Sequence, residues 1–308
     1  MTNDRPVNLP ASIRQRLLNL SIKRNEDPNL TLTRYALERL LYRLAHSAHA
    51  GQFILKGAML FAVWMNSPHR PTRDLDLLGF GDASNERLTE IFQLLCGVEV
   101  EPDGLTFDAQ SVRIAEIREG QGYPGQRVKL IGMLGNARIP VQIDVGFGDA
   151  VTPQAIEIDF PTLLDLPAPH IRAYPPETVV AEKLQAMVAL GMQNSRMRDF
   201  YDLWIIARQF SFDGAALAAA IQATFNRRQT GIPNTIPIGL SEEFVTDEHK
   251  IRQWKAFLER SQLEGSPIEL SRVIDELRTF LMPAVNSLAT ADDFNRSWDK
   301  GGPWAANK

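Results

Sequence analysis

The sequence has little cysteine, no long apolar run and no surplus of positive charge, and each shortage excludes a class of protein. A single cysteine, Cys96, among 308 residues cannot form an intrachain disulfide or a thiolate zinc site. Its apolar surroundings predict a buried structural thiol. No stretch reaches the roughly 20 apolar residues of a membrane helix, and the N-terminal residues lack the apolar core of a signal peptide. We therefore expect a cytoplasmic protein that makes no membrane contact.

The charge balance argues against a broad nucleic-acid-binding surface. The 33 Lys and Arg residues stand against 37 Asp and Glu residues, a formal net charge of −4. Proteins that bind nucleic acid mainly through the phosphate backbone are usually basic, so we expect any nucleic-acid contact of this protein on a local basic patch. The basic residues of 10–50 are better explained by solvated helix faces. Candidates for an RNA-contacting rim are Arg70, Arg73, Arg196, Arg198, Arg227 and Arg228.

Several familiar catalytic patterns are missing. There is no Gly-rich loop ending in Gly-Lys-Ser/Thr and no Gly-x-Ser-x-Gly nucleophile elbow. The five histidines are scattered, and although His46 and His49 are three residues apart, no third metal ligand follows at a suitable spacing. Triad hydrolysis and histidine-based metal binding are therefore not supported.

The hydrophobic pattern divides the chain in two. Apolar spacings of three and four predict helices over residues 12–20, 32–46, 58–65 and 84–96. Alternation predicts strands over residues 52–56, 73–78, 112–117, 127–134 and 139–145. A Pro-rich, irregular segment, 150–175, contains a short strand or turn near Ile171. Beyond it we expect helices over 176–190, 196–210, 213–226, 241–262 and 268–280, then a loosely ordered polar tail after Pro283.

The strongest chemical signal is Asp74-Leu75-Asp76 on a predicted strand. Residues two apart on a strand point to the same face, so both carboxylates share one face while Leu75 enters the core. Two carboxylates this close need a positive charge between them, and Mg²⁺ suits one or two carboxylates together with phosphate oxygens. The alternative is an exposed edge strand with solvated acids.

Two further features strengthen the metal hypothesis. Gly57 lies at a predicted strand-to-helix turn, where backbone N–H groups can approach a phosphate; an ordinary tight turn is the alternative. Asp144 lies between apolar residues of a predicted strand, and its charge needs a partner if it is buried. It would complete a carboxylate cluster if its strand adjoins that of Asp74, and otherwise it is a salt-bridged edge residue.

A third candidate group lies in the helical half. Lys183 is in the middle of an apolar helix, so its burial requires a partner; a triphosphate is suitable, and Glu177 and Glu182 are competing partners. Asp199 and Asp202 share one face of the next helix. Asp199 could orient the substrate or Lys183, or these residues could be a salt-bridged cluster on a helix surface.

These pieces, in this order, resemble the DNA polymerase β-like nucleotidyltransferases. One branch is matched more closely: residues 55–60 (Leu-Lys-Gly-Ala-Met-Leu) and 70–76 (Arg-Pro-Thr-Arg-Asp-Leu-Asp) look like the opening motif of the AbiEii/AbiGii-type toxin nucleotidyltransferases. Residues 177–184 and 196–203 look like that family's Lys-bearing helix and Arg-Asp-x-x-Asp-Leu helix. The resemblance covers about residues 50–210. Ala58 departs from it, standing where a second Gly or Ser is usual; the backbone N–H is kept and a hydroxyl contact is lost.

The resemblance implies an α+β fold, with a polymerase β-like nucleotidyltransferase domain (a small mixed sheet flanked by helices) over residues 1–172 and a helical domain over 173–308 that completes the cleft. It implies two Mg²⁺ ions held by Asp74, Asp76 and Asp144, with Lys183 and Asp199 as further catalytic residues. Nucleotide contacts are implied for Lys56, Gly57, Ala58, Arg70, Thr72, Lys183 and Arg196.

The implied activity is transfer of NMP from an NTP to an acceptor hydroxyl on RNA, with tRNA as the expected acceptor. The implied role is the toxin of a toxin–antitoxin or abortive-infection system for phage defence, with a cognate antitoxin as partner. Fold alone does not fix function, so two alternatives stay open. The acceptor could be a protein or small molecule, or the chain could be a non-catalytic nucleotide-binding module.

Overall fold

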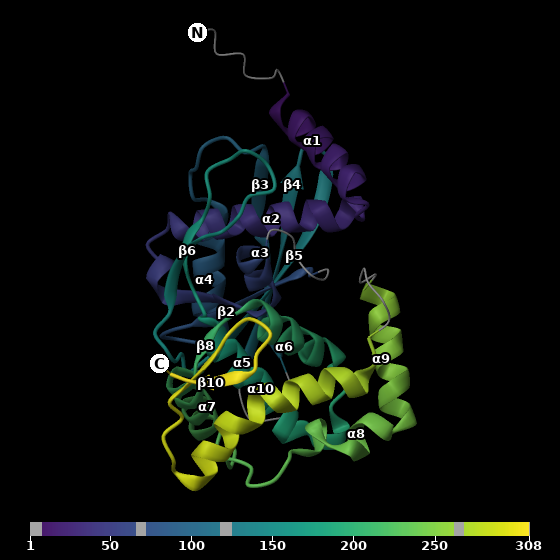
Figure 1. The fold of residues 1–308 in the computed structure, drawn as a ribbon. Coiled ribbons are helices and arrows are strands. Elements are labelled where there is room, and N and C mark those ends of the chain that lie inside the picture. The colour runs from purple at the N-terminus through teal and green to yellow at the C-terminus, as the bar shows by residue number, and fades with distance from the viewer. Residues whose placement is uncertain (1–7, 66–71, 118–124, 262–267, 308) are drawn as a thin grey trace. The chain divides into compact units, whose positions relative to one another are not determined.

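The structure, a computed structural model, describes residues 8–65, 72–117, 125–261 and 268–307 (Figure 1). The chain packs into two compact units, each with its own core. The first comprises residues 1–148 and 156–173, and the second comprises 149–155 and 174–308. The sequence pattern gave no indication that the short segment 149–155 belongs with the helical half.

A mixed sheet of seven strands forms the centre of the first unit, in the order β3-β4-β5-β2-β1-β7-β6. Neighbouring strands are antiparallel, except that β2 pairs with β5 and β1 with β7 in parallel. The predicted strands are all present, but β3 begins well before residue 112, and β6 was not predicted. The strands are β1 Phe53–Lys56, β2 Asp74–Gly79, β3 Leu105–Ile117, β4 Gly125–Leu134, β5 Ala137–Phe147, β6 Ile156–Asp159 and β7 His170–Ala173.

The four helices expected in the first unit are present, but the ends of three differ from the prediction. The first covers residues 9–24 instead of 12–20, the second begins at Pro28 instead of residue 32, and the third covers only residues 60–64 because a 3₁₀ turn precedes it. Asn8 and Asp27 cap the first two helices, their side chains accepting hydrogen bonds from Ala11 N (3.1 Å) and Asn29 N (2.9 Å). Ser84 caps the fourth in the same way. The helices are α1 Leu9–Arg24, α2 Pro28–Ala45, α3 Leu60–Trp64 and α4 Asn85–Cys96, with 3₁₀ turns η1 Ala50–Gln52 and η2 Gly57–Met59. On α4, Cys96 is half-buried, and burial raises the pKa of its thiol to about 11.

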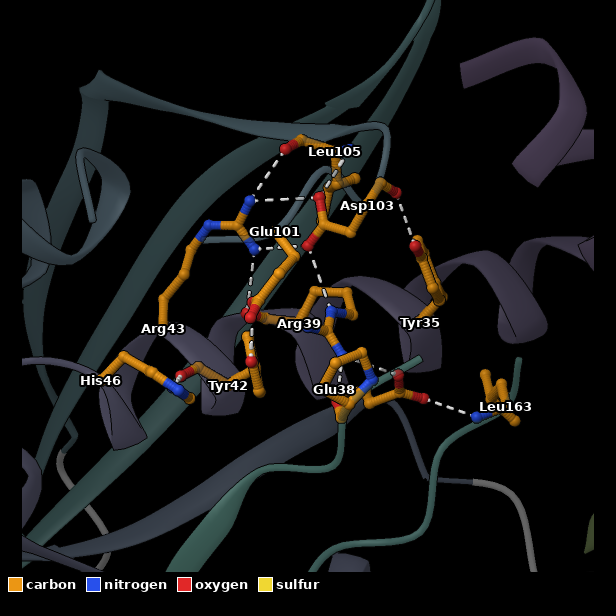
Figure 2. A network of polar contacts seen from close by, with 11 residues as sticks. Tyr35, Glu38, Arg39, Tyr42, Arg43, His46, Glu101, Asp103, Leu105 and Leu163 are labelled. Carbon is orange, nitrogen blue, oxygen red and sulfur yellow. Dashed lines mark hydrogen bonds and ion pairs between the residues drawn. The ribbon is translucent and has the colours of Figure 1, made fainter. Parts of the chain in front are cut away.

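A buried polar network fixes α2 within the unit (Figure 2). Arg43 donates to both carboxylate oxygens of Asp103 (2.8 and 3.2 Å), and Arg39 donates to Asp103 Oδ2 (3.1 Å) and to the carbonyl of Pro167 (2.8 Å). Tyr35 donates to the carbonyl of Asp103 (2.6 Å). Arg39 is fully buried and Arg43 is 5% exposed. The expectation that the basic residues of this region lie on solvated helix faces is therefore wrong for these two arginines.

The second unit is mainly helical. Its elements are α5 Pro176–Leu190, η3 Gly191–Gln193, α6 Met197–Gln209, β8 Phe212–Asp213, α7 Gly214–Arg227, η4 Ile238–Leu240, α8 Glu242–Thr246, α9 Glu248–Ser261, α10 Leu270–Thr290, β9 Arg296–Trp298 and β10 Trp304–Ala306. The last two strands join β8 in a small sheet of order β10-β9-β8. Within the described residues of the two units, no helix has the length and apolar character to cross a membrane.

Two sequence predictions for this unit are wrong. The single helix expected over 241–262 is divided at Asp247, which leaves the helical conformation (ψ 120°) and accepts a hydrogen bond from Lys250 N (2.9 Å) to start α9. The tail after Pro283 is ordered, not loose. α10 continues through Pro283, and the Trp298 ring is 4% exposed, packs against Phe280 (centroids 4.9 Å apart) and donates to a backbone carbonyl. Burial of large aromatic rings outweighs the polar composition of this segment.

Candidate active site

The two aspartates of β2 lie on one face of the sheet, as predicted. Asp74 and Asp76 are partly exposed, while Leu75 and Leu77 between and after them are each 1% exposed on the opposite face. The apolar residues fix the register of the strand, because a slip by one residue would move the whole apolar set into solvent. The core of the unit thus determines where both carboxylates point.

The strand of Asp144 is a direct neighbour of this strand. β5 pairs with β2 in parallel, with Asp144 opposite Asp76 and Gln142 opposite Asp74. Registered partners point to the same face, so all three aspartates share it. The pairing also places β5 inside the sheet, between β4 and β2, and excludes the alternative that Asp144 is an edge residue.

A row of four charged residues crosses the sheet at this level, with two carboxylates in the middle and a cation at each end. Lys56 of β1 is opposite Asp76, and Arg127 of β4 is opposite Asp144. The Arg127 guanidinium makes a two-pronged contact with Asp144, from Nε to Oδ1 (2.8 Å) and from Nη2 to Oδ2 (2.7 Å). The two side chains are 36% and 20% exposed. Asp144 is therefore salt-bridged, as one sequence alternative held, but within the sheet interior.

Gly57 lies directly against the carboxylate of Asp76. A Cβ at position 57 would come within 2.0 Å of Asp76 Oδ2, and the residue has a φ of +73°, which L side chains rarely adopt. The predicted strand-turn-helix is present as β1, η2 and α3. Because α3 has only five residues, the backbone N–H groups of the turn, and not a long helix dipole, are the available phosphate donors.

The donor set of this face suits a hard divalent cation. Carboxylate oxygens are the ligands that Mg²⁺ takes from proteins, and the absence of a side chain at Gly57 leaves the Asp76 carboxylate its place. Within the part of the chain that the structure describes, no three Asp, Glu, His or Cys side chains already gather closely enough to hold a metal ion. Asp74 and Asp76 supply two carboxylates on this face, and Asp144 supplies a third that Arg127 contacts in this structure.

A hollow of about 430 Å³ adjoins Asp74 on the first unit. Its polar lining includes Arg73, Ser111, Lys129 and Gln142. The Arg73 side chain is 70% exposed, and Lys129 is exposed, so two cations border the hollow. The sequence identified Arg73 as a candidate basic rim residue but did not identify Lys129. Only the pairing of β4 with β5, which places Lys129 opposite Gln142, brings this lysine to the hollow.

The second unit holds the predicted lysine in a buried ionic cluster. Lys183 Nζ on α5 donates to Asp199 Oδ1 (2.6 Å) and to Asp202 Oδ2 (2.9 Å) on α6. The three side chains are 15%, 10% and 0% exposed. The cluster is therefore not the surface salt-bridge network that was one reading of these residues. The two carboxylates accept hydrogen bonds from the ammonium group and fix its position.

A neighbouring cluster was not predicted. Arg228 bridges Asp149 (2.9 Å) and Glu182 (3.1 Å) and donates to Gln185 Oε1 (3.0 Å). Burial opposes its charge, but Glu182 and Asp149 more than compensate and raise the pKa of Arg228. The Arg228 side chain is 18% exposed, and its contacts with Asp149 and Glu182 connect the segment 149–155 to α5. It was expected on an RNA-contacting rim, and that expectation is wrong because its fork is filled by two carboxylates.

The other residues predicted to contact the nucleotide lie at separate places in the structure. Thr72 precedes β2, and its hydroxyl donates to the carbonyl of Asp74 (3.4 Å). Arg196 stands at the N-terminal end of α6, where its backbone N–H donates to Asn194 Oδ1 (2.9 Å). Ala58 lies in η2 after Gly57. Arg70 lies outside the described residues.

The sequence matches a family model described as nucleotidyl transferase AbiEii toxin, type IV TA system, over residues 39–282. The match includes β1, β2 and β5 with the carboxylates, and α5 and α6 with the Lys183 cluster. The chain belongs to this family. It is a nucleotidyltransferase of the AbiEii toxin type, and the family implies an NTP substrate and an antitoxin partner. A comparison with curated protein sequences finds no match.

Solved structures offer only distant similarity to this AbiEii protein. The crystal structure of JHP933 from Helicobacter pylori has 14% identity and a TM-score of 0.47, covering 83% of this chain and 92% of that one. A nucleotidyltransferase-like antigenic protein from Paracoccidioides brasiliensis has 14% identity and a TM-score of 0.34, covering 78% and 92%. At these scores the similarity adds nothing to the family assignment.

Proposed function

We propose that this AbiEii protein is a Mg²⁺-dependent toxin that transfers NMP from an NTP to an acceptor hydroxyl at the end of a tRNA, and that it acts in phage defence beside a cognate antitoxin. One observation carries the chemistry: β2 and β5 pair in a register that puts Asp74, Asp76 and Asp144 on one face, with Gly57 against the middle carboxylate. The tRNA target and the defence role rest on the family resemblance.

Asp74, Asp76 and Asp144 are the residues that would hold two Mg²⁺ ions. When bound, such ions lower the pKa of an attacking hydroxyl and offset charge on the entering and leaving oxygens. The proton of the acceptor hydroxyl would pass to a carboxylate oxygen of Asp144. The hydroxyl oxygen then forms a bond to the α-phosphorus as the bond from that phosphorus to the leaving pyrophosphate oxygen breaks.

The remaining residues would bind and orient the triphosphate. Backbone N–H groups of Gly57 and Ala58 are donors suited to phosphate oxygens. Lys183 would offset the charge that develops on pyrophosphate, and Asp199 and Asp202 hold its ammonium group in one position for this purpose. Lys56, Arg70, Thr72 and Arg196 are proposed as further nucleotide contacts.

The experiment is incubation of the purified protein with total RNA and each radiolabelled NTP in turn, with Mg²⁺ or with EDTA. Label in a tRNA-sized band that EDTA removes would support the proposal and identify the nucleotide. Label on protein or a small molecule would keep the transfer reaction and overturn the RNA acceptor. Equal label with and without EDTA would overturn the metal dependence.

A further inference from the structure

The contact between Arg127 and Asp144 conflicts with the role proposed for Asp144. Arg127 donates to both oxygens of this carboxylate, at 2.8 and 2.7 Å, from the neighbouring strand. A carboxylate whose two oxygens accept from one guanidinium is neutralised and poorly placed to take a cation as well. Asp74 and Asp76 lie on the far side of Asp144 from Arg127 in the row across the sheet. Arg127 therefore contacts Asp144 from the side of the sheet opposite to β2.

We propose that Arg127 is an exchanging ligand: it binds Asp144 while the nucleotide is absent, and it moves to a phosphate of the NTP when metal and nucleotide bind. The inference rests on the proposed function, because it assigns a role to Arg127 at the same site. Guanidinium suits both partners, since its fork binds carboxylate and phosphate oxygens alike and stays charged at every physiological pH.

Partial exposure makes the exchange feasible. The Arg127 side chain is 36% exposed and Asp144 is 20% exposed, so neither charge has to cross a sealed core to part from the other. By contrast, Arg39 and Asp103 in the same unit are 1% and 2% exposed, as suits a permanent pair. When Arg127 leaves the Asp144 carboxylate, a phosphate of the incoming triphosphate replaces it as the anionic partner of the guanidinium. The metal ion in turn becomes the cationic partner of Asp144, so no charge is left without a partner.

The exchange couples metal binding to nucleotide binding. Without nucleotide, a divalent cation at Asp144 competes with Arg127, so metal binding is weak. With nucleotide, Arg127 has another anion and Asp144 is released. Each ligand therefore favours the other, and the coupling is reciprocal. Loss of the guanidinium has two opposite effects, stronger binding of metal alone and weaker binding of nucleotide.

The test measures these two affinities separately in the full chain. Mn²⁺, a spin-active substitute for Mg²⁺, is titrated without nucleotide and followed by electron paramagnetic resonance, and a non-hydrolysable NTP analogue with Mg²⁺ is titrated by calorimetry. For Arg127→Gln we expect roughly tenfold tighter Mn²⁺ binding and roughly tenfold weaker nucleotide binding, the factor for about 1.4 kcal/mol. Affinities that both fall, or that both stay at the unmodified protein's values, would overturn the exchange.

Arg138→Gln is the matched control. Arg138 lies on the same face of β5, exposed and six residues from Asp144, about 20 Å along the strand. Arg138→Gln removes the same charge and is expected to change neither the Mn²⁺ affinity nor the nucleotide affinity. Changes equal to those of Arg127→Gln would show that both affinities respond only to the net charge of the protein, and would overturn the proposal. If Arg127→Gln fails to fold, Arg127→Lys carries the test: it keeps the charge without the fork, and unchanged Mn²⁺ affinity would overturn the exchange.

The inference and the proposed function can fail separately. Opposite shifts in Arg127→Gln with no label on RNA would keep the exchange and overturn the acceptor. Labelled tRNA from the unmodified protein, with Arg127→Gln showing no gain in Mn²⁺ binding, would keep the function and overturn the exchange.

Discussion

At the scale of single residues, the site depends on positions where a neighbouring side chain leaves no room for a larger residue. Position 57 is the clearest, since the Asp76 carboxylate occupies the place where a Cβ would lie. Gly57→Ala should therefore displace Asp76, in addition to about 1–2 kcal/mol for a left-handed conformation in an L residue. We expect loss of nucleotidyl transfer with the fold retained, measured by labelled-NTP incorporation and circular dichroism. Gly51→Ala, which has nothing within 4 Å of its added Cβ, is the control and should keep its activity.

The β2 carboxylates give a second prediction at this scale. Asp74→Asn and Asp76→Asn keep the volume of each side chain but remove the charge that a cation requires. We expect each change to abolish transfer and toxicity on expression, because each removes one of the carboxylates proposed to hold Mg²⁺. Growth of cells that express each variant measures this. A singly substituted protein that is fully toxic would contradict the assignment of that aspartate.

Lys183 gives a prediction that separates stability from chemistry. Lys183→Met leaves Asp199 and the fully buried Asp202 without their shared cation, and breaking such a buried pair costs about 3–5 kcal/mol. We expect a lower melting temperature and no activity. Adding Asp202→Asn to Lys183→Met should recover part of the melting temperature but none of the activity. Recovery of transfer in the double variant would show that Lys183 has only a structural role.

At the scale of elements, helix α2 contains a carboxyl whose ionisation opposes folding. Glu38 is 1% exposed, and its Oε2 accepts from Leu163 N (2.7 Å). Its Oε1 makes no hydrogen bond among the described residues and forms an ion pair with Arg39 Nη1 at 3.6 Å (Figure 2). Burial, above all, raises the pKa of Glu38 to about 7. Folding thus favours the protonated form, and the associated stability is complete below pH 4.5 and is lost as the pH rises through 7.

The difference between pKa values of 4.5 and about 7 corresponds to about 3 kcal/mol. Urea unfolding between pH 4 and 8 should therefore show a decline in the free energy of unfolding that Glu38→Gln reduces by this amount. The amide keeps an oxygen to accept from Leu163 N and carries no charge. Glu86→Gln removes an exposed carboxylate of α4 and should leave the decline unchanged. A Glu38→Gln profile parallel to that of the unmodified protein would refute the assignment.

The elements also show what the sequence could and could not predict. The strands of Asp74 and Asp144 were predicted from alternation alone, because one face of each is buried. Their adjacency was not, because the paired residues Asp76 and Asp144 are 68 positions apart in the sequence, and pairing between distant segments leaves no local signal. Only the order β4-β5-β2 shows that Asp144 lies inside the sheet beside β2 and is not an edge residue. Arg39 and Arg43 were misjudged because their partner, Asp103, follows α2 by about 60 residues.

At the scale of the whole molecule, the chain passes between the two units three times, at residues 148–149, 155–156 and 173–174. The returning segment supplies β7, which pairs in parallel with β1. A fragment of residues 1–148 lacks β7, so the apolar strand β1 becomes an edge, which favours association with other chains. We expect this fragment to aggregate and a 1–173 fragment to stay soluble, as measured by size-exclusion chromatography. A monomeric 1–148 fragment would contradict the expectation.

The row of charge across the sheet has a consequence for the cell that makes this protein. Its four members come from four strands and meet only in one register. A slip of β2 by a single residue would turn both aspartates toward the apolar face and Leu75 toward solvent. Such a chain would lose its core and the proposed metal-binding face together. For a nucleotidyltransferase of a toxin family, this means that a misfolded copy is also a harmless one, so the host needs its antitoxin only against molecules that have folded correctly.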